Sequence, residues 1–321
     1  GELTHAEEMY TIAIASAEVA EDEGLVAEGY LRRGDVFSRQ GKWEVCENDL
    51  EQSRKIYRKL NEHVSVGRID NIAGTNYAIQ GRMKQAQTYY RRALGSFERY
   101  NDVRMTGTVL MNLGIVYNIL GQYDEALSQY QRALSFFEKI GDRQRLAELH
   151  HNMGMSYLFK GEYKQSLSEF NRVSALVNPE SNVNLTGLAT LGKANACFYM
   201  KDLRMALSFV HHALSCFTAS NDRLSIADCY KVKGMIHREM KKFSFASSYF
   251  QTSLRINIEL KNQLNAGETY YELGVLEVMK KQPAEAKKAF VRAIECFKAV
   301  GARQDVERAE KMLKTIKTAR K

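Results

Sequence analysis

Proline is almost missing from this sequence, which has two in 321 residues. Average usage is about 5%, and most prolines lie in loops and at strand edges. Loops and strand edges are therefore few, and the sequence predicts a protein that is almost entirely helical. Long apolar runs are missing as well, since none approaches the roughly 18 residues that a transmembrane helix requires. We expect no contact with a membrane.

Cysteines are few, odd in number and widely spaced. No two form a Cys-x-x-Cys pair, so neither a disulfide framework nor a zinc site is indicated. The first residues lack the basic and apolar regions of a secretion signal. These absences favour a reducing compartment, and we expect a cytoplasmic protein. Because the sequence begins at Gly1 without an initiator Met, we also expect it to be part of a longer chain.

Motifs of known enzymes are missing too. Glycine recurs at a fixed period and not in the Gly-rich loops that hold phosphates. Two pairs of adjacent histidines occur, His150-His151 and His211-His212. Adjacent side chains on a helix point about 100° apart, and no acidic residue completes a metal-ligand face. The sequence therefore predicts no enzyme activity, no cofactor and no metal site.

The net charge of +8 is unevenly distributed. Residues 1–24 contain seven acidic residues and no Lys or Arg, whereas residues 303–321 contain seven basic and three acidic residues. Between them both signs are mixed, without the clustered basic stripe of a nucleic-acid-binding surface. We therefore expect no direct contact with nucleic acid. The acidic start and the basic end leave head-to-tail self-association open as a structural alternative.

A small residue recurs at one constant interval along the chain. The seven positions are Gly34, Gly74, Gly114, Gly154, Ala194, Gly234 and Gly274. At a constant offset after each of them stands an apolar, mostly aromatic residue: Leu50, Tyr90, Tyr130, Phe170, Val210, Phe250 and Phe290. A fixed period of this length is typical of repeat proteins, in which each unit buries its apolar face only by stacking on its neighbours.

Each copy has the pattern of two amphipathic helices. In the third copy, residues 110–117 and 126–137 both place apolar residues at helical spacing. Between them, Gly121 can take the positive φ that ends a helix, and Asp124 is predicted to cap the next one. Gly141-Asp142 marks the step to the following copy. The small residue at position 114 is expected to let the two helices approach closely.

The same register sets the limits of the array. Residues 1–24 match the second half of a copy and predict the second helix of a truncated preceding repeat. Residues 25–301 contain seven 40-residue repeats, and residues 302–321 predict a carboxy-terminal capping helix. The sequence thus predicts a single array over residues 1–321. We expect a local irregularity around residues 178–186, where the pattern breaks.

Segments such as Leu113-Gly114-Ile115-Val116-Tyr117 and Gly121-Gln122-Tyr123-Asp124-Glu125-Ala126 resemble the tetratricopeptide repeat. Because their period is longer than the usual one of about 34 residues, the copies look most like the longer repeats of kinesin light chains, spindle-orientation adaptors, bacterial peptide-pheromone receptors and maltotriose-type transcriptional activators. The resemblance implies an all-α fold, a right-handed α-solenoid superhelix of helix-turn-helix repeats. It also implies that the first helices of the repeats line a concave groove in which partners bind.

The side of the first helices that would line this groove is apolar, with an asparagine in each of the middle copies. Apolar strips rimmed by polar groups often mark interaction sites, and amides can bond an extended peptide backbone. The partner-binding candidates are Arg68, Asn71, Met111, Asn112, Ile115, His151, Asn152, Met155, Leu158, Phe159, Leu191, Asn195, Phe198 and Tyr199. Two alternatives stay open: the asparagines bond their own helix or water, and the large apolar residues pack on the neighbouring first helix.

These patterns predict a scaffold that binds an extended or helical segment of a partner protein in the groove. A second interpretation is a regulatory domain that senses a peptide or small ligand within a larger signalling or transcription-regulating protein. Basic residues near the start of the groove side, Arg32, Arg39 and Arg68, favour a partner that is acidic toward the first repeats.

Overall fold

The computed structural model describes residues 2–318, which form sixteen α-helices and, within that range, no strand. These residues fall into two compact units, divided between Ser156 and Tyr157. Unit 1 contains α1 (Glu2–Val19), α2 (Glu23–Arg39), α3 (Trp43–Lys59), α4 (His63–Ile79), α5 (Met83–Arg99), α6 (Val103–Ile119), α7 (Tyr123–Ile140) and most of α8 (Arg143–Lys160). Unit 2 continues with α9 (Tyr163–Leu176), α10 (Val183–Tyr199), α11 (Leu203–Ala219), α12 (Arg223–Glu239), α13 (Phe243–Glu259), α14 (Gln263–Met279), α15 (Pro283–Ala299) and α16 (Arg303–Thr318).

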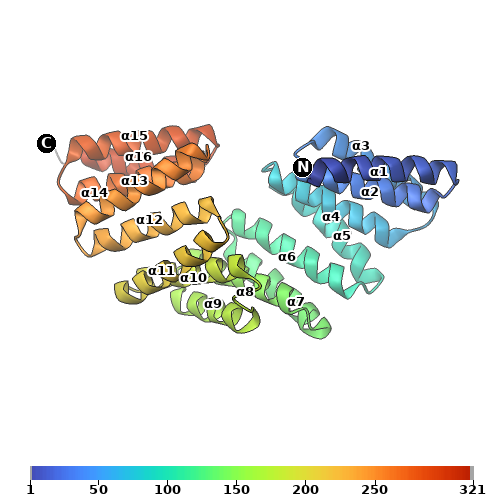
Figure 1. Ribbon diagram of the computed structural model, residues 1–321, viewed down its shortest axis with the longest axis horizontal. Helices are drawn as coiled ribbons and strands as arrows, with labels where there is room; N and C mark the ends of the chain where they lie inside the picture. Colours follow the sequence, from blue (N-terminus) through green and yellow to red (C-terminus); the bar gives the residue numbers. More distant parts are fainter. Residues whose placement is uncertain (1, 319–321) are drawn as a thin grey trace. The chain divides into compact units, whose positions relative to one another are not determined.

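Consecutive helices in unit 1 pack as pairs, as the repeat pattern predicts. The pairs α2–α3, α4–α5 and α6–α7 each join the first and second helix of one repeat, and successive helices lie side by side in chain order (Figure 1). The first helices also contact one another, α2 with α4 and α4 with α6. The first helices are therefore flanked on several sides, which limits the surface that they expose.

The close approach within a pair depends on a glycine that faces a ring. A Cβ atom added at Gly114 would lie 2.3 Å from Cε1 of Tyr130, closer than real carbon atoms approach. Tyr130 is fully buried on the second helix of the same repeat. The predicted reason for the small residue is thereby confirmed.

The turn between α6 and α7 is only partly as predicted. Gly121 has a φ of +73°, which confirms its expected left-handed conformation. The prediction that Asp124 caps α7 is wrong, because the cap residue is Gln122 and its side chain makes no capping hydrogen bond. Asp124 lies two residues further on, in the first helical turn, where its carboxylate faces the positive end of the helix dipole. Asp142 does cap the next helix, since its Oδ1 accepts from the backbone N–H of Arg145 at 3.1 Å.

Unit 2 repeats this arrangement with the pairs α10–α11, α12–α13 and α14–α15, and with contacts from α10 to α12 and from α12 to α14. The irregularity expected around residues 178–186 is confirmed near the start of unit 2. Helix α9 has 14 residues, and Val177 leaves it in an extended conformation. Asn182 then caps α10, accepting from the backbone N–H of Leu185. Two lysines replace core leucines in this unit: Lys193 donates to Ser174 at 2.7 Å, and Lys233 lies over the ring of Tyr249.

The terminal helices lie against the outermost pairs. Helix α1 contacts α2, and α16 contacts α15. On α16, Ala309 is buried in a cluster with Ile294 and Phe297, and Arg308 lies 4.3 Å from the ring centre of Tyr271. Residue 1 and residues 319–321 of the expected terminal segments lie outside the described residues. The single array predicted from the period stays a prediction.

Candidate protein-binding surface

The first helices of unit 1 expose apolar residues at one register. Ile79 and Ile119 stand one repeat apart, in the last turns of α4 and α6, and are 62% and 59% exposed. Ile115, one turn earlier on α6, is 37% exposed. We call the side of α4 and α6 that carries these three residues the first-helix face. A side chain of this kind gains about 25 cal/mol for each Å² of apolar surface that a partner covers.

Two predicted asparagines meet on the first-helix face. Nδ2 of Asn112 on α6 donates to Oδ1 of Asn71 on α4 at 3.1 Å, and both side chains are half-buried. The bond links neighbouring first helices, an arrangement that neither sequence alternative contained. Because an amide has two donor hydrogens and an acceptor oxygen, each side chain keeps further hydrogen-bonding capacity for a partner.

Arg68 is held by an acidic residue of the same chain. Its guanidinium donates to both carboxylate oxygens of Glu28, at 3.0 and 2.9 Å, and Arg32 and Tyr57 donate to the same carboxylate at 2.6 and 2.7 Å. Burial alone would raise the pKa of Glu28, but these hydrogen bonds outweigh it and lower the pKa to about 2. Arg39 pairs with Asp35 at 2.9 Å. The three arginines that favour an acidic partner in the sequence analysis are therefore already paired within the chain.

Four of the predicted partner-binding residues are buried. They are Met111, Leu158, Leu191 and Phe198. Leu191 and Phe198 belong to the core of unit 2. The prediction that these side chains line an open surface is wrong, because both flanks of a first helix pack against other helices of the stack. This agrees with the second alternative of the sequence analysis, in which the large apolar residues pack on the neighbouring first helix.

Three predicted residues lie on the part of α8 that belongs to unit 1. His151, Asn152 and Met155 are all half-buried. Burial lowers the pKa of His151 to about 4, so its imidazole is neutral at pH 7. None of these residues is as exposed as Ile79 or Ile119.

Three further predicted residues of unit 2 are at least partly exposed. Phe159 and Tyr199 are exposed, and Asn195 is half-buried. The ring of Tyr199 stacks on Tyr163 with centres 5.1 Å apart and meets Phe198 edge-on at 5.2 Å. Tyr199 is thus both a surface residue and a support for its neighbours.

Further along unit 2, charged residues of the first helices pair with one another. Lys231 on α12 lies 3.0 Å from Asp228 and also pairs with Glu268 on α14. Burial alone would lower the pKa of Lys231, but the two carboxylates raise it above its usual value. Arg238 pairs with Glu272 in the same way, from α12 to α14. These pairs tie the two helices together.

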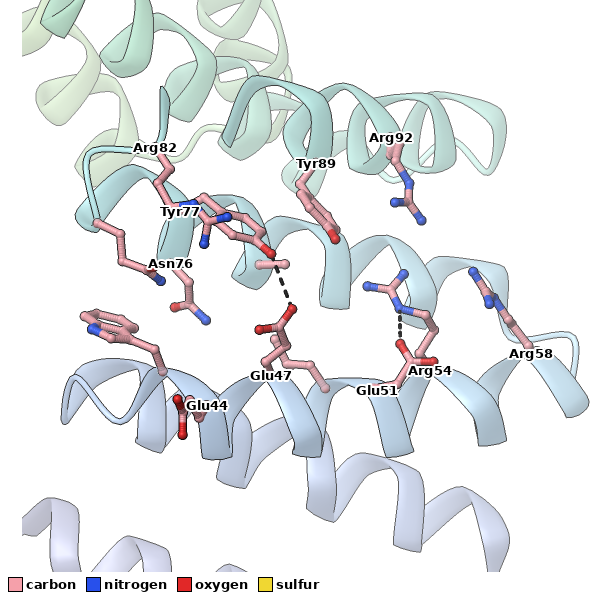
Figure 2. Close-up of a pocket in the computed structure, with 14 residues that line it drawn as sticks. Glu44, Glu47, Glu51, Arg54, Arg58, Asn76, Tyr77, Arg82, Tyr89 and Arg92 are labelled. Carbon is pink, nitrogen blue, oxygen red and sulfur yellow. Dashed lines mark hydrogen bonds and ion pairs between the residues drawn. The ribbon is translucent and has the colours of Figure 1, made fainter. Parts of the chain in front are cut away.

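A polar cavity in unit 1 was not predicted from the sequence. It has a volume of about 510 Å³ and lies between α3, α4 and α5 (Figure 2). Arg54, Arg58, Arg92 and Trp43 are among the residues that line it. The sequence does contain a signal for it, because several lining residues depart from the type that other repeats have at the same register.

Neither a metal site nor a membrane span emerges from the part of the chain that the structure describes. Over residues 2–318, no group of three His, Cys, Asp or Glu side chains is arranged to hold a metal ion. In the same range no helix has the length and apolarity to cross a membrane.

Comparisons with known proteins identify the repeat. The family model of the tetratricopeptide repeat matches residues 25–99 and 105–178. A comparison with curated proteins gives no match.

Solved structures share the fold over nearly the whole chain. A tetratricopeptide repeat protein from Parabacteroides merdae ATCC 43184 has a TM-score of 0.65 and 18% identity, covering 90% of this chain and 98% of that one. A Rap protein complexed with competence and sporulation factor has a TM-score of 0.62 and 14% identity, covering 99% and 98%. The apo form of the quorum sensor NprR from B. thuringiensis has a TM-score of 0.61 and 12% identity, covering 98% of each chain.

At these identities the similarity concerns the fold alone. Together with the constant period, the paired helices and the family match, it confirms the all-α fold of stacked helix pairs predicted from the sequence. Residues 25–99 and 105–178 match the tetratricopeptide repeat family, and the chain shares the fold of a solved tetratricopeptide repeat protein.

Proposed function

We propose that the protein is a scaffold without enzymatic activity, and that its first-helix face binds an extended or helical segment of a partner protein. The observation that carries this proposal is the exposure of Ile79 and Ile119 on the helices that hold the Asn71–Asn112 pair. The isoleucines offer apolar area, and the amides offer hydrogen bonds that do not depend on the partner's sequence. The location we propose is the cytoplasm, since all five cysteines are free thiols.

A second candidate function is sensing of a peptide or small ligand. Two observations favour it: the likeness in fold to the Rap protein complexed with competence and sporulation factor, and the likeness to the quorum sensor NprR. A thermal-shift screen with peptides and metabolites tests this candidate. A ligand present at about 100 times its Kd adds about 2.7 kcal/mol of stability, which is easily measured.

Self-association through the acidic start and the basic end is a third candidate. One of the acidic residues, Glu7, already pairs with Lys42 of the same chain at 2.8 Å, which reduces the charge that a second copy would meet. Light scattering at low and high salt tests this interaction. Mass that falls as salt is added supports it, and a monomer under both conditions rejects it.

The scaffold proposal is tested with peptides selected from a phage-displayed random library on the whole chain. The binding constants of the selected peptides are then compared for the wild type and the double variant Ile79→Ser/Ile119→Ser. The matched control is Val45→Ser/Phe245→Ser, which removes exposed apolar side chains from second helices instead.

We expect the first-helix variant to weaken peptide binding by at least about tenfold, which corresponds to about 1.4 kcal/mol. The control variant should bind as the wild type does, and both should keep the wild-type circular dichroism spectrum. Equal binding by wild type and first-helix variant, or equal losses in both variants, would reject the first-helix face as the binding surface.

A further inference from the structure

The cavity in unit 1 lies on the second-helix side of the repeats and is separate from the first-helix face. Most of its wall comes from α3 and α5, and α4 forms its floor between them (Figure 2). Its volume of about 510 Å³ falls within the range of about 300–1,000 Å³ that is usual for ligand sites.

Two residues that line the cavity are smaller than their equivalents in other repeats. Leu50 stands where most other repeats have a ring: Tyr90, Tyr130, Phe170, Phe250 and Phe290. Ala73 stands where all other repeats have a long side chain: Arg33, Leu113, Met153, Lys193, Lys233 and Leu273. Space that the other repeats fill with their own side chains is therefore left open between α3 and α4.

Polar residues replace apolar ones beside this space. Arg54 occupies the register of Leu94, Leu134, Leu214, Leu254 and Ile294. Its guanidinium donates to Asp70 at 2.7 Å, and the two side chains are 8% and 5% exposed. Burying such a pair costs desolvation that an apolar pair would avoid. Local departures from the rules of a fold concentrate at functional sites, so this pair marks the cavity as a site.

The charges that line the cavity are separated along its length. Glu44 and Glu47 lie near the start of α3, with Arg82 as the one basic residue opposite them. At the other end, the lining residues are the basic Arg54, Arg58 and Arg92 and the acidic Glu51. Asp70 does not line the cavity but pairs with Arg54 and Arg92, and its charge is counted with theirs. Each end therefore carries one net charge, negative at the start of α3 and positive toward its end.

The positive end has capacity for an additional anion. Arg58 has no ion-pair partner among the described residues. Arg92 lies 3.4 Å from Asp70, a carboxylate that already accepts from Arg54 at 2.7 Å. A carboxylate placed between Arg58 and Arg92 would gain charge-assisted hydrogen bonds.

Aromatic rings line the middle of the cavity. Tyr77 and Tyr89 stack with centres 5.1 Å apart, and the guanidinium groups of Arg82 and Arg92 lie over their respective rings, at 4.7 and 5.1 Å. Together with Leu50, which also lines the cavity, these rings can accept an apolar side chain.

The geometry points to a binding site for a short peptide with free termini. Its amino group would lie toward Glu44 and Glu47, its carboxylate toward Arg58 and Arg92, and an apolar side chain over Leu50. The distance along α3 from Glu47 to Arg58 is about 16 Å at 1.5 Å per residue. A chain extended at about 3.3–3.6 Å per residue covers it with four to five residues. The site thus differs from the proposed scaffold function in both its helices and its ligand.

Trp43 provides the measurement, because it is the sole tryptophan of the chain and lines the cavity. The probe is a pool of pentapeptides with free termini, made from Ala, Ser, Leu and Phe, so that it adds no tryptophan. Binding is followed by Trp43 fluorescence and compared with the same pool after amino-terminal acetylation or carboxy-terminal amidation. The variants are Arg58→Gln, and Leu50→Tyr to fill the cavity. The control is Arg132→Gln, at the register of Arg92 one repeat later.

We expect the free pool to change Trp43 fluorescence at concentrations below about 1 mM, and either blocking group to weaken binding about tenfold. In Arg58→Gln, amidation should have little further effect, because the partner of the carboxylate is already gone. Leu50→Tyr should abolish binding and keep the helical content, since Gly34 faces position 50 as Gly74 faces Tyr90. Arg132→Gln should bind as the wild type does.

Three outcomes would overturn this inference. They are no response to the free pool up to about 1 mM, equal binding of free and blocked pools, and unchanged binding in a folded Leu50→Tyr variant. Each of them leaves the first-helix face untouched, because that surface is tested with other residues and another readout.

Discussion

The phenol oxygen of Tyr90 lies 3.0 Å from Oγ1 of Thr75, and the two form a hydrogen bond between α5 and α4. One repeat later, Tyr130 has Ile115 at the register of Thr75. The Tyr130 hydroxyl is buried and has no hydrogen-bond partner among the described residues. A buried hydroxyl without a partner costs about 1–3 kcal/mol. The hydroxyl of Tyr90 therefore stabilises its repeat, whereas the hydroxyl of Tyr130 destabilises the next one.

We therefore predict that Tyr130→Phe leaves stability unchanged or raises it by up to about 1 kcal/mol, whereas Tyr90→Phe lowers it by about 0.5–1.5 kcal/mol. Phe already occupies this register at Phe170, Phe250 and Phe290. Urea unfolding followed by circular dichroism measures both variants. A loss in Tyr130→Phe as large as that in Tyr90→Phe would mean that the Tyr130 hydroxyl is satisfied after all.

A second prediction concerns the glycine that faces Tyr130. Gly114→Ala should destabilise the protein by about 1–3 kcal/mol, because the added methyl group would overlap the ring unless the two helices separate. Thermal unfolding measures the effect. Combined with Tyr130→Ala, the substitution should cost much less than it does alone, since the ring that it meets is gone.

Gly95→Ala is the matched control for this substitution. Gly95 lies within α5, and a Cβ atom there would have nothing within 4 Å. Alanine has the higher helix propensity by about 1 kcal/mol, so this variant should be more stable than the wild type. A loss of stability in Gly95→Ala would show that helix pairing constrains the exposed side of α5 as well.

The repeat pattern was sufficient to predict the helix pairs, because equivalent positions recur at one fixed interval and make equivalent contacts. One such contact is that of Gly114 with the ring of Tyr130, which the structure confirms. Local capping was less predictable. Helix α7 begins two residues earlier than predicted, so that Gln122 and not Asp124 is its cap residue. Periodicity does not locate a helix start in a short turn to within two residues.

The binding surface could be predicted only in part. A helical wheel describes one helix, so it separates the side that faces the partner helix from the opposite side. It does not contain the neighbouring first helices, which also cover part of that opposite side and bury Met111. The Asn71–Asn112 bond and the pairing of Arg68 with Glu28 likewise depend on neighbouring repeats.

Glu28 gives the third prediction, which concerns acid stability. Its pKa of about 2 in the folded protein lies below the ordinary value of 4.5, so the carboxylate stabilises the fold above pH 4.5. That contribution is lost as the pH falls from 4.5 through 2. The stability advantage of the wild type over Glu28→Gln should shrink by about 1–2 kcal/mol over this interval, a value reduced for partial exposure.

Urea unfolding at pH 7, 5 and 3 measures this difference. Glu98→Gln is the control, because Glu98 forms an ion pair with Arg132 that is exposed on both sides and contributes little. A constant difference between wild type and Glu28→Gln at all three pH values would contradict the role assigned to the hydrogen bonds from Arg68, Arg32 and Tyr57.

The last prediction concerns the buried pair of Arg54 and Asp70. Asp70→Leu alone should destabilise the protein by about 3–5 kcal/mol, because it leaves the buried Arg54 with only Glu51, 3.4 Å away. The double variant Arg54→Leu/Asp70→Leu should recover to within about 1 kcal/mol of the wild type or exceed it, since it restores the leucines that the third repeat has at both registers. Thermal and urea unfolding of the wild type, Arg54→Leu, Asp70→Leu and the double variant give the coupling free energy of the pair. A double variant as unstable as Asp70→Leu would contradict this prediction and show that the pair stabilises the fold, whereas recovery would show that stability does not require the ion pair.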